Sequence, residues 1–180
     1  MNPRGVRLLV IEALKNKTDA ADRVYSPRDW PTTADMYPVL LVQTPIDVKN
    51  SLGRNVPQFN TVTTVRITGR LQELDDAAED NGAEKAEEAL EQLREQVERA
   101  VINSYELTRK IQQFLQVRST IDVDASGEGH TAQLLMELDI EYYQGPEEFY
   151  EIDASPLEGI DVTISMPDGT PEPLVKIDLE

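Results

Sequence analysis

The chain has 180 residues, a formal net charge of −17 and no cysteine. Its length favours one main domain built around one hydrophobic core. The lack of cysteine excludes disulfides, thiolate nucleophiles and cysteine-ligated metal sites. We expect a soluble protein that is not exported, because no apolar run resembles a signal peptide or reaches the length of a membrane span.

The acidic residues are concentrated in two blocks. Residues 73–99 hold 11 acids and 3 bases, and residues 147–180 hold 10 acids and 1 base. Residues 1–72 lean the other way, with 10 bases and 6 acids. This asymmetry favours head-to-tail contact between copies of the chain, although the acids alone would also serve to keep a surface soluble. Binding of nucleic acid in a groove is disfavoured, since no contiguous basic patch with interleaved aromatic residues occurs.

The first expected element is an amphipathic helix over residues 3–16. Pro3 fits its first turn, where a missing N–H costs little. The apolar residues recur with helical spacing and predict one buried stripe: Val6, Leu9, Val10, Ala13 and Leu14.

Two strands are expected next, after a short extended piece at residues 23–25. Pro38 keeps Tyr37 out of the helical region, and the apolar run over residues 37–42 predicts a strand that is covered on both faces and ended by Pro45. A polar loop should follow at residues 50–58. The segment 59–71 then alternates apolar and polar residues and predicts a half-buried strand, with Phe59, Val65, Ile67 and Leu71 on one face.

The region from residue 72 to residue 104 changes from an acidic loop to a helix of about 20 residues. Its apolar face predicts a helix lying on a sheet, because the heptad pattern is too short for a coiled coil. That face consists of Ala86, Leu90, Leu93, Val97, Ala100, Val101 and Ser104. The carboxylates elsewhere on this helix form a candidate acidic surface, which would line a lumen, contact another subunit or simply face solvent: Glu84, Glu87, Glu88, Glu91, Glu95 and Glu98.

A second, shorter helix is expected over residues 104–116, with Leu107, Ile111, Phe114 and Leu115 on its apolar side. The clearest β-hairpin of the chain comes next. Its first strand has Val117, Ser119, Ile121 and Val123 on one face. Its second strand has Ala132, Leu134, Met136, Leu138, Ile140 and Tyr142 on one face, and the two are joined through "ASGEGH".

The last part of the chain, residues 145–180, is expected to form an extension of its own. Residues 145–160 have the composition of a linker, and a small hairpin should follow around "PDG". A two-stranded ribbon is marginal alone, so this hairpin should lie on a neighbouring chain. Its candidate contacts are Val162, Ile164, Val175 and Ile177.

The sequence offers no convincing catalytic or metal site. His130 is the only histidine, and we interpret it as an exposed residue of the hairpin turn. The segment from Asp122 resembles a calcium loop in its first positions, but Gln133 stands where the bidentate Glu belongs and strands flank it. Asp75, Asp76, Glu79 and Asp80 are interpreted as a solvated loop. We therefore predict no enzyme activity and no cofactor.

The order of elements over residues 3–144 resembles the tail terminator family of long-tailed bacteriophages, including the lambda-like member. The likeness lies in the opening helix "VRLLVIEALK", in "ADMYPVLLVQT", which is similar to that family's acid–x–aromatic–proline entry into its first core strand, and in "LLMELDIEYY". The expected fold is α/β (α+β), with a small mostly antiparallel or mixed sheet packed by two main helices and a C-terminal β-hairpin arm. The domains are residues 1–144 and the extension 145–180.

The resemblance implies a structural virion protein of the tail or neck, assembled in the host cytoplasm. It would form a homohexameric ring at the head-proximal end of the tail tube, stop tube polymerisation and contact the head–tail connector or neck protein. DNA would only pass through, and no membrane would be involved. The alternatives are another phage neck or tail-completion protein, or an acidic adaptor domain unrelated to phage.

Overall fold

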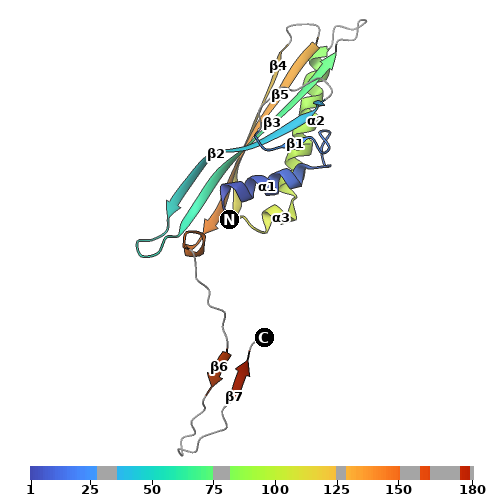
Figure 1. Cartoon of the computed structure of the whole chain (residues 1–180). Helices are drawn as coiled ribbons and strands as arrows, with labels where there is room; N and C mark the ends of the chain where they lie inside the picture. Colours follow the sequence, from blue (N-terminus) through green and yellow to red (C-terminus); the bar gives the residue numbers. More distant parts are fainter. Residues whose placement is uncertain (28–35, 75–81, 125–128, 151–158, 163–174, 179–180) are drawn as a thin grey trace, which may run out of the picture. The chain divides into compact units, whose positions relative to one another are not determined.

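The computed structural model describes residues 1–27, 36–74, 82–124, 129–150, 159–162 and 175–178 (Figure 1). The chain divides into two compact units, Met1–Phe149 and Tyr150–Glu180. In the first unit, helices pack on a mixed five-stranded sheet, which is the predicted small α+β fold.

The first helix, α1 (Pro3–Leu14), begins as predicted and ends two residues earlier. The side chain of Asn2 caps it by accepting a hydrogen bond of 2.9 Å from the Gly5 N–H, and Pro3 occupies the first turn. The predicted stripe is buried except at Leu9, which is partly exposed, and Ile11 is buried beside it. The helix contacts the sheet mainly through β2 (Val39–Ser51) and β3 (Phe59–Leu74).

Strand β2 is longer than predicted. Both faces of its first part are covered, as expected, since the adjacent residues Val39 and Leu40 are both fully buried. The prediction that Pro45 ends the strand is wrong, because β2 continues to Ser51 across a register shift between Gln43 and Ile46. Such a bulge accommodates a residue that has no N–H to donate.

The sheet has the strand order β1-β2-β3-β5-β4. Strand β1 (Val24–Tyr25) pairs in parallel with β2, and all other pairs are antiparallel. The predicted hairpin is confirmed, since β4 (Gln113–Asp124) pairs with β5 (Gly129–Gln144). Strand β5 therefore lies between β3 and β4, and its even-numbered residues from Ala132 to Tyr142 are fully buried.

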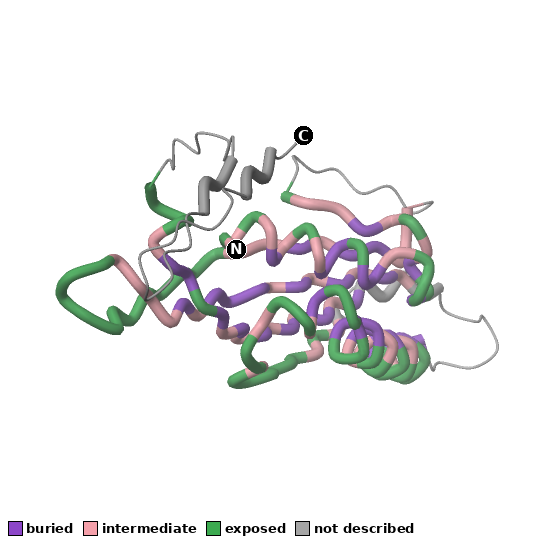
Figure 2. Tube along the Cα trace, turned by 90° about the horizontal axis from the view of Figure 1, so that it is seen from below, coloured by how far each residue is buried: buried purple, intermediate pink, exposed green. Residues whose placement is uncertain are grey.

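The long helix α2 (Gly82–Ile102) lies across β3, β4 and β5, as predicted, and buries its whole apolar face (Figure 2). Gly69 permits this close packing. A Cβ atom at this position would lie 3.1 Å from a methyl carbon of Leu93 and 3.2 Å from one of Leu40. The helices thus cover one face of the sheet, and no helix among the described residues covers the other.

The predicted second helix is wrong in its extent. Only α3 (Tyr105–Thr108) is helical, and β4 begins at Gln113, so Phe114 and Leu115 belong to a strand. Their spacing suits a helix, but the backbone of this segment bonds to β5 instead, beginning with the N–H of Gln112 donating to the carbonyl of Glu141 at 2.8 Å. Tertiary pairing overrides local periodicity here.

The first unit ends in a short 3-10 helix, η2 (Pro146–Glu148), after which the ring of Phe149 packs edge-on against Phe59 at 5.4 Å. In the second unit, β6 (Gly159–Val162) pairs with β7 (Val175–Asp178). This hairpin begins earlier than the sequence indicates, and it sets Val162 opposite Val175. Ile164 lies outside the described residues.

Candidate assembly surfaces

The residues with catalytic or metal-binding potential are not brought together. No group of three or more His, Asp or Glu side chains in the described part of the chain could hold a metal ion. Asp122 is exposed near the end of β4, and the backbone of His130 belongs to β5, opposite Glu73. The predicted acidic loop at residues 75–80 and the turn at residues 125–128 lie outside the described residues.

The uncovered face of the sheet carries a compensated set of charges. Arg66 donates to one carboxylate oxygen of Glu137 on β5 at 3.0 and 2.8 Å, and Thr64 donates to Asp139 at 2.6 Å. Arg118 on β4 lies 3.2 Å from the Glu137 carboxylate and 3.6 Å from that of Asp139. Two cations therefore face two anions, and this surface lacks the excess of positive charge that a phosphate backbone requires.

A hydrogen-bonded polar cluster replaces the apolar core where β2 and β3 run toward their shared loop. Its centre is the buried side chain of Gln144, whose oxygen accepts from Thr61 at 2.7 Å and from Lys49 at 2.5 Å. The amide nitrogen of Gln144 donates to the carbonyl of Met1 at 2.7 Å, and the amino group of Met1 is paired with Glu148. This cluster links Met1, just before α1, with β2, β3, the end of β5 and Glu148.

A second group of hydrogen-bonded polar side chains, Asp47, Thr63 and Tyr142, lies next to Gln144 on the same side of the sheet. The hydroxyl of Thr63 donates to Asp47 at 2.6 Å and lies 3.0 Å from the hydroxyl of Tyr142. Burial raises the pKa of Tyr142 from 10.0 to about 12; the Thr63 hydrogen bond opposes this shift and the nearby Asp47 carboxylate adds to it. The phenol therefore stays neutral well above the pH at which an exposed tyrosine ionises.

We expect the stability of the fold to fall between pH 10 and pH 12 because of Tyr142. In this range the unfolded chain loses the phenolic proton and the folded chain retains it, so unfolding is favoured by up to about 1.4 kcal/mol per pH unit. Urea unfolding of the wild type and of Tyr142→Phe, compared from pH 8 to pH 11.5, measures this contribution. The difference in stability between the two proteins should shrink at high pH, and a constant difference would contradict the assignment.

Beyond the polar cluster, the β2–β3 hairpin extends past the helices, and the residues toward its tip are exposed (Figure 2). Ile46 and Val48 on β2 are about half exposed, as are Leu52 and Val56 near the tip. In a monomer these side chains would remain in contact with water. A row of apolar residues on a projecting hairpin is typical of a surface that is covered in an assembly.

The two edges of the sheet differ in how well they are protected. On one side, β1 pairs only with Leu40 and Leu41, and the bulge with Pro45 interrupts the rest of the β2 edge. On the other side, β4 presents 12 residues without proline or glycine, and in the described part of the chain it pairs only with β5. As far as the described residues show, the unit has one blunted edge and one open edge.

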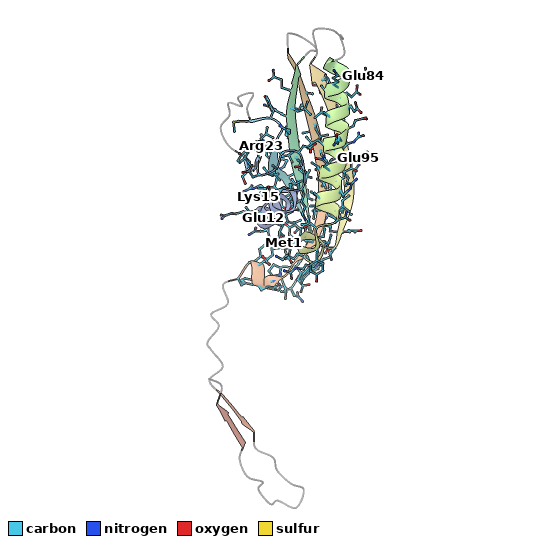
Figure 3. All side chains as sticks on the ribbon, turned by 90° about the vertical axis from the view of Figure 1, so that its right-hand side faces the viewer. Met1, Glu12, Lys15, Arg23, Glu84 and Glu95 are labelled. Atoms are coloured by element: carbon cyan, nitrogen blue, oxygen red, sulfur yellow. The ribbon has the colours of Figure 1, made fainter. Side chains whose placement is uncertain are left out.

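The candidate acidic surface lies along the outside of α2. Its six glutamates are exposed, apart from the half-buried Glu98, and Figure 3 shows Glu84 and Glu95 at successive levels of the helix. Glu91 lies 3.6 Å from Arg94, which compensates part of the charge. The helix brings these carboxylates together on one surface, as the periodicity indicates. Among the described residues, none of them forms a hydrogen bond or ion pair with a strand of the sheet.

The residues of the polar cluster and the open edge of β4 were not identified from the sequence. A signal for the cluster exists in β3, where Thr61 and Thr63 occupy the alternate positions that hold Val65 and Ile67 further along. Polar residues at such positions indicate either exposure or buried hydrogen bonds. Which strand forms the edge of a sheet depends on strand order, which the alternation within each strand does not specify.

Comparison with known proteins gives no further assignment. Neither the scan against protein-family models nor the search of curated proteins finds a match to this chain. No helix in the described residues combines the length and the apolar character needed to cross a lipid bilayer.

Proposed function

We propose that this chain is a structural virion protein of the tail terminator type. In this proposal it forms a hexameric ring at the head-proximal end of the tail tube, stops tube polymerisation and contacts the connector on the head side. The observation that carries the proposal is the succession of elements in the first unit. The first unit contains a capped helix, a proline-led strand, a long strand, a long helix and a hairpin, in the order on which the sequence resemblance to that family rests.

The unlike edges of the sheet support a ring rather than a symmetric dimer. A contact between two different surfaces of the same subunit repeats from copy to copy and closes when the rotation allows it. The blunted β2 edge and the open β4 edge provide two such different surfaces. The charge distribution agrees, since the basic residues 1–72 and the acidic α2 belong to the same subunit.

Assembly of the purified chain tests this proposal. Native mass spectrometry and negative-stain electron microscopy should show hexameric rings, either in solution or after addition of tail tube protein. A symmetric dimer that persists at every concentration, with no ring on tails, would rule the proposal out. A ring that binds connector without stopping tube growth would favour another neck protein instead.

We expect the assembly to be sensitive to salt if α2 faces the basic region of a neighbour. Exposed charges are screened once ionic strength passes roughly 0.1 M, so the association constant should fall steadily above that value. The triple variant Glu88→Gln, Glu91→Gln, Glu95→Gln should associate more weakly at low salt and lose most of this dependence. Analytical ultracentrifugation at several salt concentrations measures both effects.

If the triple variant assembles like the wild type at every salt concentration, α2 makes no contact between subunits. The glutamates would then be assigned to the lumen or to the outer wall. An acidic lumen would repel the phosphates of passing DNA and so avoid retaining it. Locating α2 in a reconstruction of the ring distinguishes the two positions.

A further inference from the structure

Strand β4 has the properties of a docking site for another strand. Residues 115–120 are exposed, including the apolar Leu115 at 50% and Val117 at 37%. The central basic residue of this strand, Arg118, is turned toward Glu137 and Asp139 on β5 and so does not protect the edge. Past the register shift between Phe114 and Gln116, no other described strand pairs with the outer edge of β4, which therefore offers a row of backbone donors and acceptors for pairing.

A shallow apolar groove of about 620 Å³ opens beside the start of β4. It is lined by Lys110 just before the strand, by Tyr143 on β5, and at the N-terminal side by Met1, Gly5, Leu8, Leu9 and Glu12. Leu8 and Tyr143 are each nearly half exposed. The groove therefore adds apolar surface to the end of the open edge.

The second unit is a strand pair that needs such a surface. The register sets Ile160 opposite Ile177 and Val162 opposite Val175, with Asp161 opposite Lys176 between them. This alternation is typical of a ribbon with one buried face. Four residue pairs join its described strands, and an isolated two-stranded hairpin is marginally stable at best in water.

Charge favours contact between this hairpin and the start of β4. Residues 150–180 contain 8 acids and 1 base, so they are strongly acidic. Around the start of β4, Arg109 is paired with Glu106 at 2.6 Å and Arg118 is paired with Glu137 at 3.2 Å. The exposed Lys110 is therefore the base that we assign to attracting the acidic hairpin. Complementary charge of this kind directs the approach and the orientation of a partner.

We propose that the β6–β7 hairpin of one copy adds to the β4 edge of the next copy and extends its sheet. This inference rests on the proposed function for its head-to-tail geometry. The nine residues from 150 to 158 can span at most about 30 Å, so the docking site must lie within that distance of the point where the first unit ends. Each subunit in a ring would then give one hairpin and receive one.

Cross-linking between full-length chains tests this docking directly. The natural chain has no cysteine, so introduced thiols react without background. A Gln116→Cys chain, with its thiol near the start of β4, is mixed with an Asp161→Cys chain, with its thiol on β6, and treated with a short bismaleimide. A covalent dimer of the two different chains is expected, whereas Glu95→Cys on α2 in place of Gln116→Cys should give about tenfold less product.

The outcomes separate this inference from the proposed function. Hexameric rings without the β4–β6 product overturn the docking site and leave the ring intact. The product without rings supports the docking site and overturns the ring. Reaction only when both cysteines are in one chain overturns docking between copies.

A charge variant provides an independent check on the same contact. Lys110→Glu should reduce the yield of the β4–β6 product several-fold at low salt, because it places a negative charge where the acidic hairpin approaches. The matched control is Lys85→Glu, which makes the same change on the exposed side of α2. Equal yields from the two variants would contradict the assigned position of the hairpin.

Discussion

A chain ending at Phe149 is expected to fold normally and to assemble poorly. Every residue of the main hydrophobic core lies before Gln144, and Phe149 is retained because it packs on Phe59. The truncated chain should therefore keep a cooperative thermal transition within a few degrees of the wild type. Loss of the few strand hydrogen bonds made by the hairpin should weaken association by about 2 kcal/mol, or roughly thirtyfold.

Differential scanning calorimetry and sedimentation analysis measure the two effects separately. A full-length variant carrying Val162→Asp and Val175→Asp should reproduce the loss of association, because these two residues are paired in the hairpin. If the truncated chain fails to fold, the second unit contributes to the main core. If it folds, assembles and terminates tails as well as the complete chain does, the hairpin has no role in assembly.

Leu134→Ala is expected to be among the most destabilising single substitutions in the first unit. Leu134 is fully buried at the centre of β5, between Gly69 on β3 and Ile121 on β4. Shortening it removes contacts beneath α2 and leaves a cavity, which typically costs about 2–5 kcal/mol. Urea unfolding should show this loss, with a fall in Tm on the order of 10 °C for a unit of this size.

The adjacent residue supplies the matched control. Leu135 points to the uncovered face of the same strand and is partly exposed. Leu135→Ala should therefore cost about 1 kcal/mol or less. Equal losses for the two variants would mean that the register of β5 is shifted by one residue, since such a shift exchanges the two faces.

The elements with long, regular patterns were predictable from the sequence. The apolar face of α2 and the alternation in β5 each repeat over several turns or residue pairs, so no local irregularity obscures them. The segment around Ile111, Phe114 and Leu115 was assigned wrongly, because three apolar residues at helical spacing also fit an irregular strand start. Phe114 and Leu115 belong to a strand because this segment pairs with β5, and that pairing partner is distant in sequence.

The candidate surfaces were less predictable than the fold. The acidic face of α2 follows from helical spacing alone, and so it was identified. The open edge of β4 depends on β5 lying between β3 and β4, which reflects the packing of the whole sheet. The buried cluster around Gln144 likewise depends on bringing Met1, Lys49 and Thr61 together from three parts of the chain.

The unbroken pairing of β3 with β5 fixes the length of the sheet in the first unit. Both strands are 16 residues long and pair in one register from Phe59–Gln144 to Leu74–Gly129, over about 50 Å. Removing one residue would turn the following side chains to the opposite face, so the length can change only by two residues in both strands together. A change of length within the sheet that keeps both faces of this unit intact therefore comes in steps of two residues per strand, or about 7 Å.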